Sequence, residues 1–301
     1  MMIVRLWLIL ILAVMPVGIA AQTDDPEREG GIIGTGIVGT VTALGSIIVN
    51  GQRITFDDSL EIAAGVTLAH AADLRPGHRV AVIARRDGPD WRAQVIRQIV
   101  PLVGPISRGA DGTLRILGTV FTIPPDAPDL RPGDWVAVSG LWQSDRVIGT
   151  RIEYLHPEAI GQARIEGSVF LADPVSGTPA SLRVGQTRIS GLIPRHLSDG
   201  DVVRATGSAR GDVLAAATLA TGVFETRLDT VLAEGYLSPP RPSGLYTVLG
   251  ADIVSFTDNP GMIDPEARQI ACGLAGRITQ MMPADGAAAE IAGGLAACLP
   301  D

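Results

Sequence analysis

One short pattern recurs four times along this chain at nearly constant spacing. Each copy has an apolar run, a glycine and a second short run; the clearest copy is Ile47 to Phe56, IIVNGQRITF. The glycines stand 65 to 67 residues apart, at Gly51, Gly118, Gly185 and Gly250. A glycine between two such runs is typical of a hairpin turn, and Asn50-Gly51 is the pair preferred where both turn residues need positive φ. The period indicates structural units that repeat along the chain, each containing one hairpin.

A second pattern, DLRPG, occurs in the first two repeats, at Asp73 to Gly77 and Asp129 to Gly133. Each copy runs into an apolar strand-like segment. Proline followed by glycine fits a type II turn, in which the glycine takes positive φ. We therefore expect structural turns at Pro76, Gly77, Pro132 and Gly133.

Further short segments repeat in the same order around these turns. They give each unit about five short strands separated by Gly- and Pro-containing turns, which is typical of a small antiparallel barrel or sandwich. The predicted fold is all-β, with tandem small antiparallel OB-like barrels and a short C-terminal helical pair. The expected repeats span 38–100, 101–157 and 162–225, with a partial fourth repeat at 228–258. The short joint at 156–161 favours a semi-rigid string of units.

The C-terminal segment, 259–301, has a helical pattern. Asp264-Pro265 is a typical helix start, and Ile270, Leu274 and Ile278 are spaced to share one helix face. An alanine-rich second helix is expected at 287–297.

Both cysteines, Cys272 and Cys298, lie in this C-terminal segment. An even number of cysteines in an exported chain predicts one disulfide, and two buried free thiols are the alternative. The spacing of these cysteines is not that of a metal site, and we expect neither a bound metal nor a cofactor.

The N-terminus has the order of a secretory signal peptide: Arg5, an apolar run from Leu6 to Val14, and small residues before Ala21. The alternative is an uncleaved anchor. We expect a signal peptide at 1–20, cleaved after Ala20, followed by a flexible linker at 21–37. The mature protein is then periplasmic or secreted, and its only membrane contact is during export.

The net charge of the chain is −8, and removal of Arg5 with the signal peptide would make it −9. Nucleic acids and anionic membrane surfaces attract a positive field, so this charge argues against both as partners. An envelope protein or a polysaccharide remains as the expected partner.

The first repeat resembles a bacterial family of exported small-β-barrel repeat domains of unknown function. The resemblance rests on Gly39-Thr40-Val41, on Gly45 to Gly51 (GSIIVNG), and on Leu74 to Val82. It is good over residues 36–100, fair over 101–155 and weak over 162–222. It implies an OB-like barrel and an envelope location, and it transfers no catalytic residue.

Three tryptophans are the speculative ligand-binding residues: Trp91, Trp135 and Trp142. They are candidates to stack on a sugar ring or peptide, or alternatively to fill a barrel interior. The histidines, at positions 70, 78, 156 and 196, stand singly and do not have the spacing of a metal site. Asp199-Gly200-Asp201 is interpreted as a turn.

These observations favour a non-enzymatic exported binding or scaffolding protein. The alternative is an oligosaccharide- or peptidoglycan-binding module. A hydrolase with its site between barrels is the third hypothesis, and it requires polar side chains from several units to converge in one cleft.

Overall fold

The first unit is a closed barrel of five strands. The computed structural model describes residues 34–155, 161–171, 182–192, 194, 196–285 and 298. The strands and one short 3-10 helix of this unit are β1 (Thr35–Ala43), β2 (Ile47–Val49), β3 (Gln52–Thr55), β4 (Ile62–Ala63), η1 (Ala71–Asp73), β5 (Arg79–Asp87) and β6 (Asp90–Ile99). The ring runs β1-β2-β3-β6-β5 and back to β1, with β3 and β6 parallel and the other pairs antiparallel. The short β4 pairs with β6 outside this ring.

The second and third units repeat the same order of strands. The second unit contains β7 (Leu102–Pro105), β8 (Ser107–Arg108), β9 (Leu114–Ile116), β10 (Thr119–Val120), β11 (Trp135–Gln143) and β12 (Arg146–Tyr154). The third contains β13 (Ala163–Ser168), β14 (Leu182–Val184), β15 (Thr187–Gly191), β16 (Val202–Arg210) and β17 (Val213–Thr221). In both units, the second half of the hairpin lies parallel to the last strand: a single bridge joins Phe121, directly after β10, to Val147, and a ladder joins β15 to β17.

A fourth unit is complete, which corrects two sequence predictions. It contains β18 (Thr230–Tyr236), β19 (Leu245–Thr247), β20 (Val254–Phe256), the 3-10 helix η3 (Pro260–Met262), β21 (Arg268–Leu274) and β22 (Arg277–Pro283). The repeat predicted to stop at residue 258 therefore continues, and residues 268–283 form a hairpin where a helix was expected. The predicted second helix, at 287–297, lies outside the described residues.

The helix prediction failed because β21 is buried on both faces. Ile270 packs in the core of the first unit, whereas its neighbour Ala271 packs in the core of the fourth unit. A strand covered on both sides shows no alternation of apolar and polar residues. The two-residue turn Ala275-Gly276, with φ of +49° and +81°, ends β21 and starts β22.

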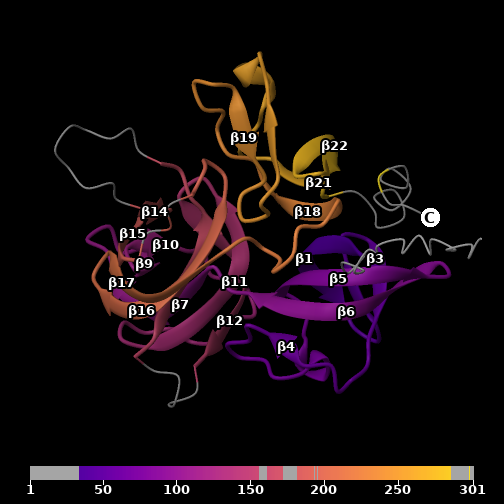
Figure 1. The fold of residues 1–301 in the computed structure, drawn as a ribbon. Helices are drawn as coiled ribbons and strands as arrows, with labels where there is room; N and C mark the ends of the chain where they lie inside the picture. Colours follow the sequence, from indigo (N-terminus) through magenta and orange to yellow (C-terminus); the bar gives the residue numbers. More distant parts are fainter. Residues whose placement is uncertain are drawn as a thin grey trace, which may run out of the picture. The chain divides into compact units, whose positions relative to one another are not determined.

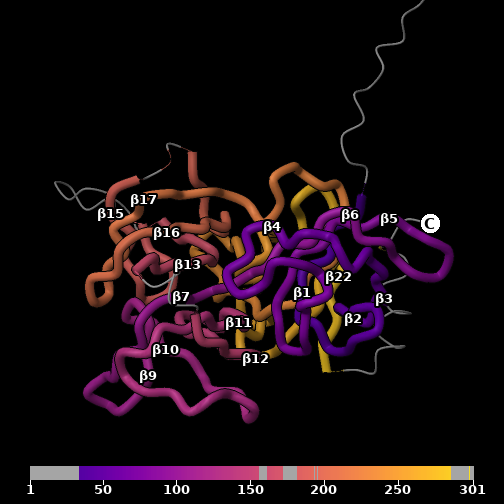
Figure 2. Tube along the Cα trace, turned by 90° about the horizontal axis from the view of Figure 1, so that it is seen from below, coloured from indigo at the N-terminus to yellow at the C-terminus, as the bar shows by residue number. Residues whose placement is uncertain are grey.

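The four units associate in two pairs through shared sheets. β1 pairs in parallel with β18, which joins the first unit to the fourth (Figure 1). β7 pairs with β13, which joins the second unit to the third, and Figure 2 shows β7, β13 and β16 side by side. The described residues from position 34 onwards cluster as one compact unit, so the expected string of units is wrong.

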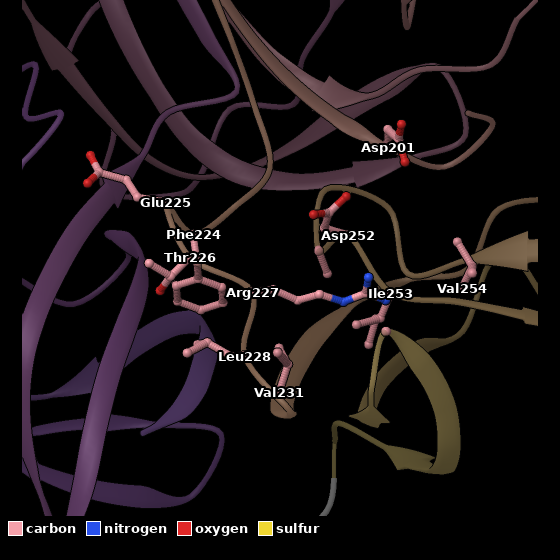
Figure 3. A pocket seen from close by; sticks show the side chains of 12 residues that line it. Asp201, Phe224, Glu225, Thr226, Arg227, Leu228, Val231, Asp252, Ile253 and Val254 are labelled. Carbon is pink, nitrogen blue, oxygen red and sulfur yellow. The ribbon is translucent and has the colours of Figure 1, made fainter. Parts of the chain in front are cut away.

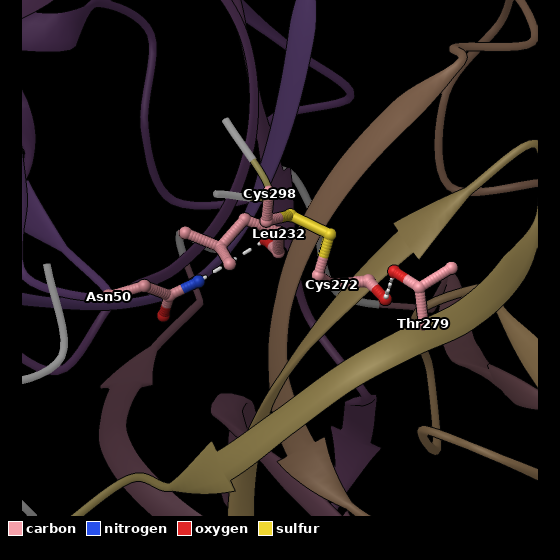
Figure 4. Close-up of a disulfide and its surroundings, with 5 residues drawn as sticks. All are labelled: Asn50, Leu232, Cys272, Thr279 and Cys298. Carbon is pink, nitrogen blue, oxygen red and sulfur yellow. Dashed lines mark hydrogen bonds between the residues drawn. A yellow bond between two sulfur atoms is a disulfide. The ribbon is translucent and has the colours of Figure 1, made fainter. Parts of the chain in front are cut away.

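A disulfide joins Cys272 of β21 to Cys298, as the sequence predicted (Figure 4). The described residues are all-β, with no helix of seven residues or more. No helix among them is long and apolar enough to cross a membrane. The predicted signal peptide and most of the linker lie outside the described residues.

Candidate functional site

The predicted turn glycines all lie in turns. Asn50 and Gly51 have φ of +53° and +71°, and Leu117 and Gly118 have φ of +52° and +79°. Gly185 and Gly250 also have positive φ, as do Gly77 and Gly133 after their prolines. These positions suit glycine or asparagine because a Cβ disfavours positive φ.

These turns also form the joints between units. Thr119, after the second unit's turn, places its hydroxyl 3.0 Å from that of Thr187, after the third unit's turn. The backbone N–H of Gly250 donates to the hydroxyl of Ser168 in the third unit, at 2.9 Å. The spacing of the hairpin turns therefore also sets the positions of contacts between units.

Trp142 fills one of these joints. Its indole is 4% exposed, and Nε1 donates to the carbonyl oxygen of Glu166 at 2.7 Å. The ring lies against Gly167 and Gly185 of the third unit, and a Cβ on either glycine would overlap it. Trp142 therefore packs between the second and third units, and its ring contacts residues of the third unit rather than solvent.

The other candidate tryptophans lie apart from Trp142. Trp91 is 2% exposed in the first unit's core, where Nε1 donates to Gln52 and Arg86 stacks on the ring. Trp135 is partly buried and packs against two core clusters. Trp91 fills a barrel interior, the alternative role considered for these tryptophans.

His78 lies at the junction of the first and second units. Its Nδ1 accepts a hydrogen bond from the backbone N–H of Arg75, and its Nε2 lies 2.9 Å from Glu153 of β12. Glu153 also accepts from Thr67. Burial alone would raise the pKa of Glu153, but the hydrogen bonds from His78 and Thr67 outweigh it and lower the pKa to about 2. His78 itself is fully buried, so this pair is a structural contact.

Two buried ion pairs connect the first unit to the third and fourth. Arg97 lies 2.6 Å from Glu166, and Arg79 lies 3.9 Å from Glu234 while donating to the carbonyl oxygen of Glu234 at 2.6 Å. Both carboxylates precede a glycine at the same place in their units. The repeated Glu-Gly is visible in the sequence, but it does not show which arginine each carboxylate contacts.

The candidate site is a cleft of about 400 Å³ between the third and fourth units (Figure 3). An apolar part is formed by Phe224, Leu228, Val231 and Ile253. The polar lining includes three carboxylates and one guanidinium, from Asp201, Glu225, Asp252 and Arg227. Figure 3 shows the Phe224 ring among these side chains, on the segment that connects β17 to β18. The cleft thus offers one aromatic ring and several hydrogen-bond acceptors.

The pKa of Asp252 lies above its ordinary value. Burial raises the pKa of Asp252, and the nearby charge of Asp201 raises it further, while a hydrogen bond from the Val202 backbone N–H opposes them. The residue has φ of +60° in the turn region between β19 and β20. Asp201 comes from the third unit and Asp252 from the fourth, so two acids from different units line one cleft.

The chemistry of this cleft suits a polar, uncharged or cationic ligand. Carboxylates accept hydrogen bonds from hydroxyl or ammonium groups, and an aromatic ring packs on the apolar face of a ligand. No group of three or more potential metal ligands occurs in the described part of the chain. The described histidines do not enter the cleft: His78 is buried in the first unit, and the cleft is lined by other residues.

Sequence reasoning did not find this cleft. Asp201 was predicted to lie in a turn. Its carboxylate accepts a hydrogen bond from the Ser198 backbone N–H at 2.7 Å. Phe224 and Arg227 lie on an irregular connecting segment whose pattern suggests no site.

Two of the four units match a known protein family. Residues 35–97 and 103–153 match the family described as a domain of unknown function, DUF5666. These two segments correspond to the first and second units, so the predicted resemblance to a repeated domain of unknown function is confirmed there. No curated protein and no solved structure matches the chain.

Proposed function

We propose that this chain is a non-enzymatic, exported binding and scaffolding protein of the bacterial envelope, built from four OB-like barrels. The pairing order of the first unit supports the OB-like assignment, because five strands close into one small barrel. The same neighbours recur in the second and fourth units, where single bridges replace some of the ladders. In the third unit, β14 pairs with β15 and β15 with β17, but no ladder joins β13 to β14 among the described residues.

Export is supported by two features. The N-terminal sequence has the order of a signal peptide, and the Cys272–Cys298 disulfide suits an oxidising compartment. Buried ion pairs between units hold the barrels in fixed positions, as a scaffold requires.

The observation that favours ligand binding is the cleft between the third and fourth units. The ring of Phe224 and the carboxylates of Asp201 and Asp252 line one space of about 400 Å³, which suits part of an oligosaccharide. We therefore propose an oligosaccharide, such as a peptidoglycan fragment, as the ligand. In this proposal Phe224 is the stacking residue. Trp91 and Trp142 are both buried, so neither can stack on a ligand.

A titration of the mature chain with soluble peptidoglycan fragments, followed by calorimetry, tests this proposal. Phe224→Ala should weaken binding about tenfold or more, because removing the ring loses packing against the ligand. A tenfold change corresponds to roughly 1.4 kcal/mol of binding free energy. Phe256→Ala is the matched control, because that ring is 55% exposed on β20 and lies outside the cleft. Equal affinities in the two variants, or no binding by the wild type, would refute the cleft as the site.

The same samples test the hydrolase hypothesis. Fragments incubated with the wild-type protein and with Asp252→Asn are compared by mass spectrometry. We expect intact fragments in both. Cleavage by the wild type that is lost in Asp252→Asn would show that the non-enzymatic assignment is wrong.

A further inference from the structure

The outer face of the third unit has a cluster of arginines with too few acidic partners. Arg164 and Glu166 lie two apart on β13, and their partners across the ladder on β16 are Thr206 and Arg204. Residues two apart on a strand, and those directly opposite them, share one face of a sheet. Arg97 of β6 reaches this face from the first unit, since its guanidinium pairs with Glu166 at 2.6 Å.

The positive charges in this cluster exceed the negative ones. Arg97, Arg164 and Arg204 contribute three positive charges, and Glu166 contributes one negative charge. Glu225, exposed on the connecting segment, acts on Arg204 at longer range and forms no ion pair with it among the described residues. Counting Glu225 as well still leaves an excess of one positive charge, three minus two.

The hydrogen bonds leave much of this cluster unpaired. Arg164 donates through Nη1 to the carbonyl oxygen of Ala64 at 3.0 Å. Arg97 donates to Glu166 and to Val223, but its second Nη and one oxygen of Glu166 are buried without a partner. Arg204 has no side-chain hydrogen bond or ion pair within the described ranges, so its guanidinium is available.

The positive charges of this cluster are partly removed from water. Burial lowers the pKa of both Arg164 and Arg204, and the other arginines of the cluster lower it further. Charges that are partly removed from water need partners, and in this acidic chain the missing partner is an anion.

A cavity adjoins the cluster. It has a volume of about 280 Å³ and lies where the first three units meet. Arg164, Thr206 and Gln162 supply its polar lining, and Val66, Val103 and Leu155 supply its apolar lining. Guanidinium donors beside a hydroxyl and an amide are the groups that bind carboxylate and phosphate oxygens.

We propose that this cavity, lined by Arg164, Thr206 and Gln162, forms a groove with the neighbouring Arg204 and binds an oxyanion of the carboxylate or phosphate type. Arg164 and Thr206 line the cavity and supply N–H groups and a hydroxyl. Arg204, two residues from Thr206 on β16, lies outside the cavity lining and supplies a further positive charge from the same face of the sheet. The groove is separate from the cleft at Phe224 and does not depend on what that cleft binds.

Thermal unfolding of the full mature chain in different salts tests this site. Potassium phosphate is compared with potassium chloride at equal ionic strength, and sodium acetate is a third arm. At a phosphate concentration about one hundred times Kd, the unfolding midpoint of the wild type should rise by about 5 °C. A response to acetate as well would show that the groove also accepts carboxylates, and a response to phosphate alone would restrict the site to phosphate-type anions.

Two variants assign the effect to the groove. Arg204→Gln breaks no side-chain hydrogen bond within the described residues, so it should fold, and it should reduce the phosphate shift by half or more. The control is the double variant Arg183→Gln/Arg188→Gln, which removes two exposed arginines that face each other on β14 and β15 of the same unit. The control should keep the full shift. An equal shift in the wild type and Arg204→Gln, or no shift in the wild type, would overturn the proposal.

Discussion

Asn50, in the first hairpin turn, donates a hydrogen bond from Nδ2 to the carbonyl oxygen of Leu232, 182 residues further along the chain, at 3.3 Å. The same nitrogen donates to the carbonyl oxygen of Val38 at 3.0 Å. Val38 lies on β1 and Leu232 on β18, the parallel strands that join the first and fourth units. The side chain of a turn residue therefore connects the two units (Figure 4).

Replacement of Asn50 should destabilise this junction by an amount that depends on the residue introduced. Asn50→Gly keeps a residue that tolerates positive φ but removes the donor, which should cost about 1–3 kcal/mol in the free energy of unfolding. Asn50→Asp should cost more, because a carboxylate would face two carbonyl oxygens. Urea unfolding measures both. Ser144→Gly is the control, because Ser144 also has positive φ but is exposed, and it should lose no stability. An Asn50→Asp variant as stable as wild type would contradict this interpretation.

Two glycines with similar backbone angles allow the cost of crowding a neighbouring side chain to be measured separately from the cost of backbone strain. Gly185 and Gly211 have φ of +53° and +63°, so alanine is strained at both positions. A Cβ at Gly185 would overlap the Trp142 ring, whereas a Cβ at Gly211 would meet nothing within 4 Å. Gly185→Ala should therefore lose about 1–3 kcal/mol more than Gly211→Ala, by urea unfolding. Equal losses would mean that Trp142 moves aside at no cost.

The sequence predicted the local features of this fold well. The hairpin turns, the Pro-Gly turns, the all-β class and the disulfide were all visible, because each depends on residues close in sequence or on a simple count. Asn50-Gly51 shows this clearly, since the preference of the pair for positive φ is a property of the two residues themselves.

The contacts between units were not visible. Whether Asn50 reaches Leu232, or Arg97 reaches Glu166, depends on how whole units pack, and no local pattern encodes that. The same packing misled the helix prediction: Ile270 and Ala271 are both buried because β21 lies between two units, so the alternation that marks a strand is absent. The cleft at Phe224 was missed for a related reason, because its lining comes from two units and an irregular connecting segment.

The buried ion pair between Arg97 and Glu166 should contribute far more to stability than an exposed pair. Their side chains are 7% and 2% exposed. Glu166→Gln should cost about 3–5 kcal/mol, because it leaves Arg97 buried without a charged partner. Asp129→Asn is the control: Asp129 pairs with Arg131 at 3.3 Å, but both side chains are largely exposed, at 85% and 78%. Calorimetric unfolding should show no measurable loss for the control. A small loss in Glu166→Gln would mean that water replaces the carboxylate.

The disulfide should stabilise the fourth unit against unfolding. Cys272 and Cys298 are 26 residues apart, and closing a loop of that length restricts the unfolded chain by about 3 kcal/mol. Reduction of the wild type should lower its free energy of unfolding by that amount. Cys298→Ser should already have the lower value and should not respond to reductant. A wild-type protein insensitive to complete reduction would show that the bridge contributes nothing to stability.

Glu153 gives the fold a defined acid sensitivity. Its pKa in the folded protein is about 2, below the ordinary value of 4.5, because His78, Thr67 and Arg151 donate hydrogen bonds that outweigh its burial. A carboxyl group with a lowered folded pKa stabilises the fold above its unfolded pKa, and this contribution, at most about 3 kcal/mol, is lost as the pH falls from about 4.5 to about 2. Glu153→Gln should therefore be less stable than wild type at pH 7, and the difference should shrink steadily towards pH 2. Glu61→Gln, at an exposed side chain of the same charge, should track the wild type throughout. A difference between Glu153→Gln and wild type that is independent of pH would show that the hydrogen bonds of Glu153 do not depend on its charge.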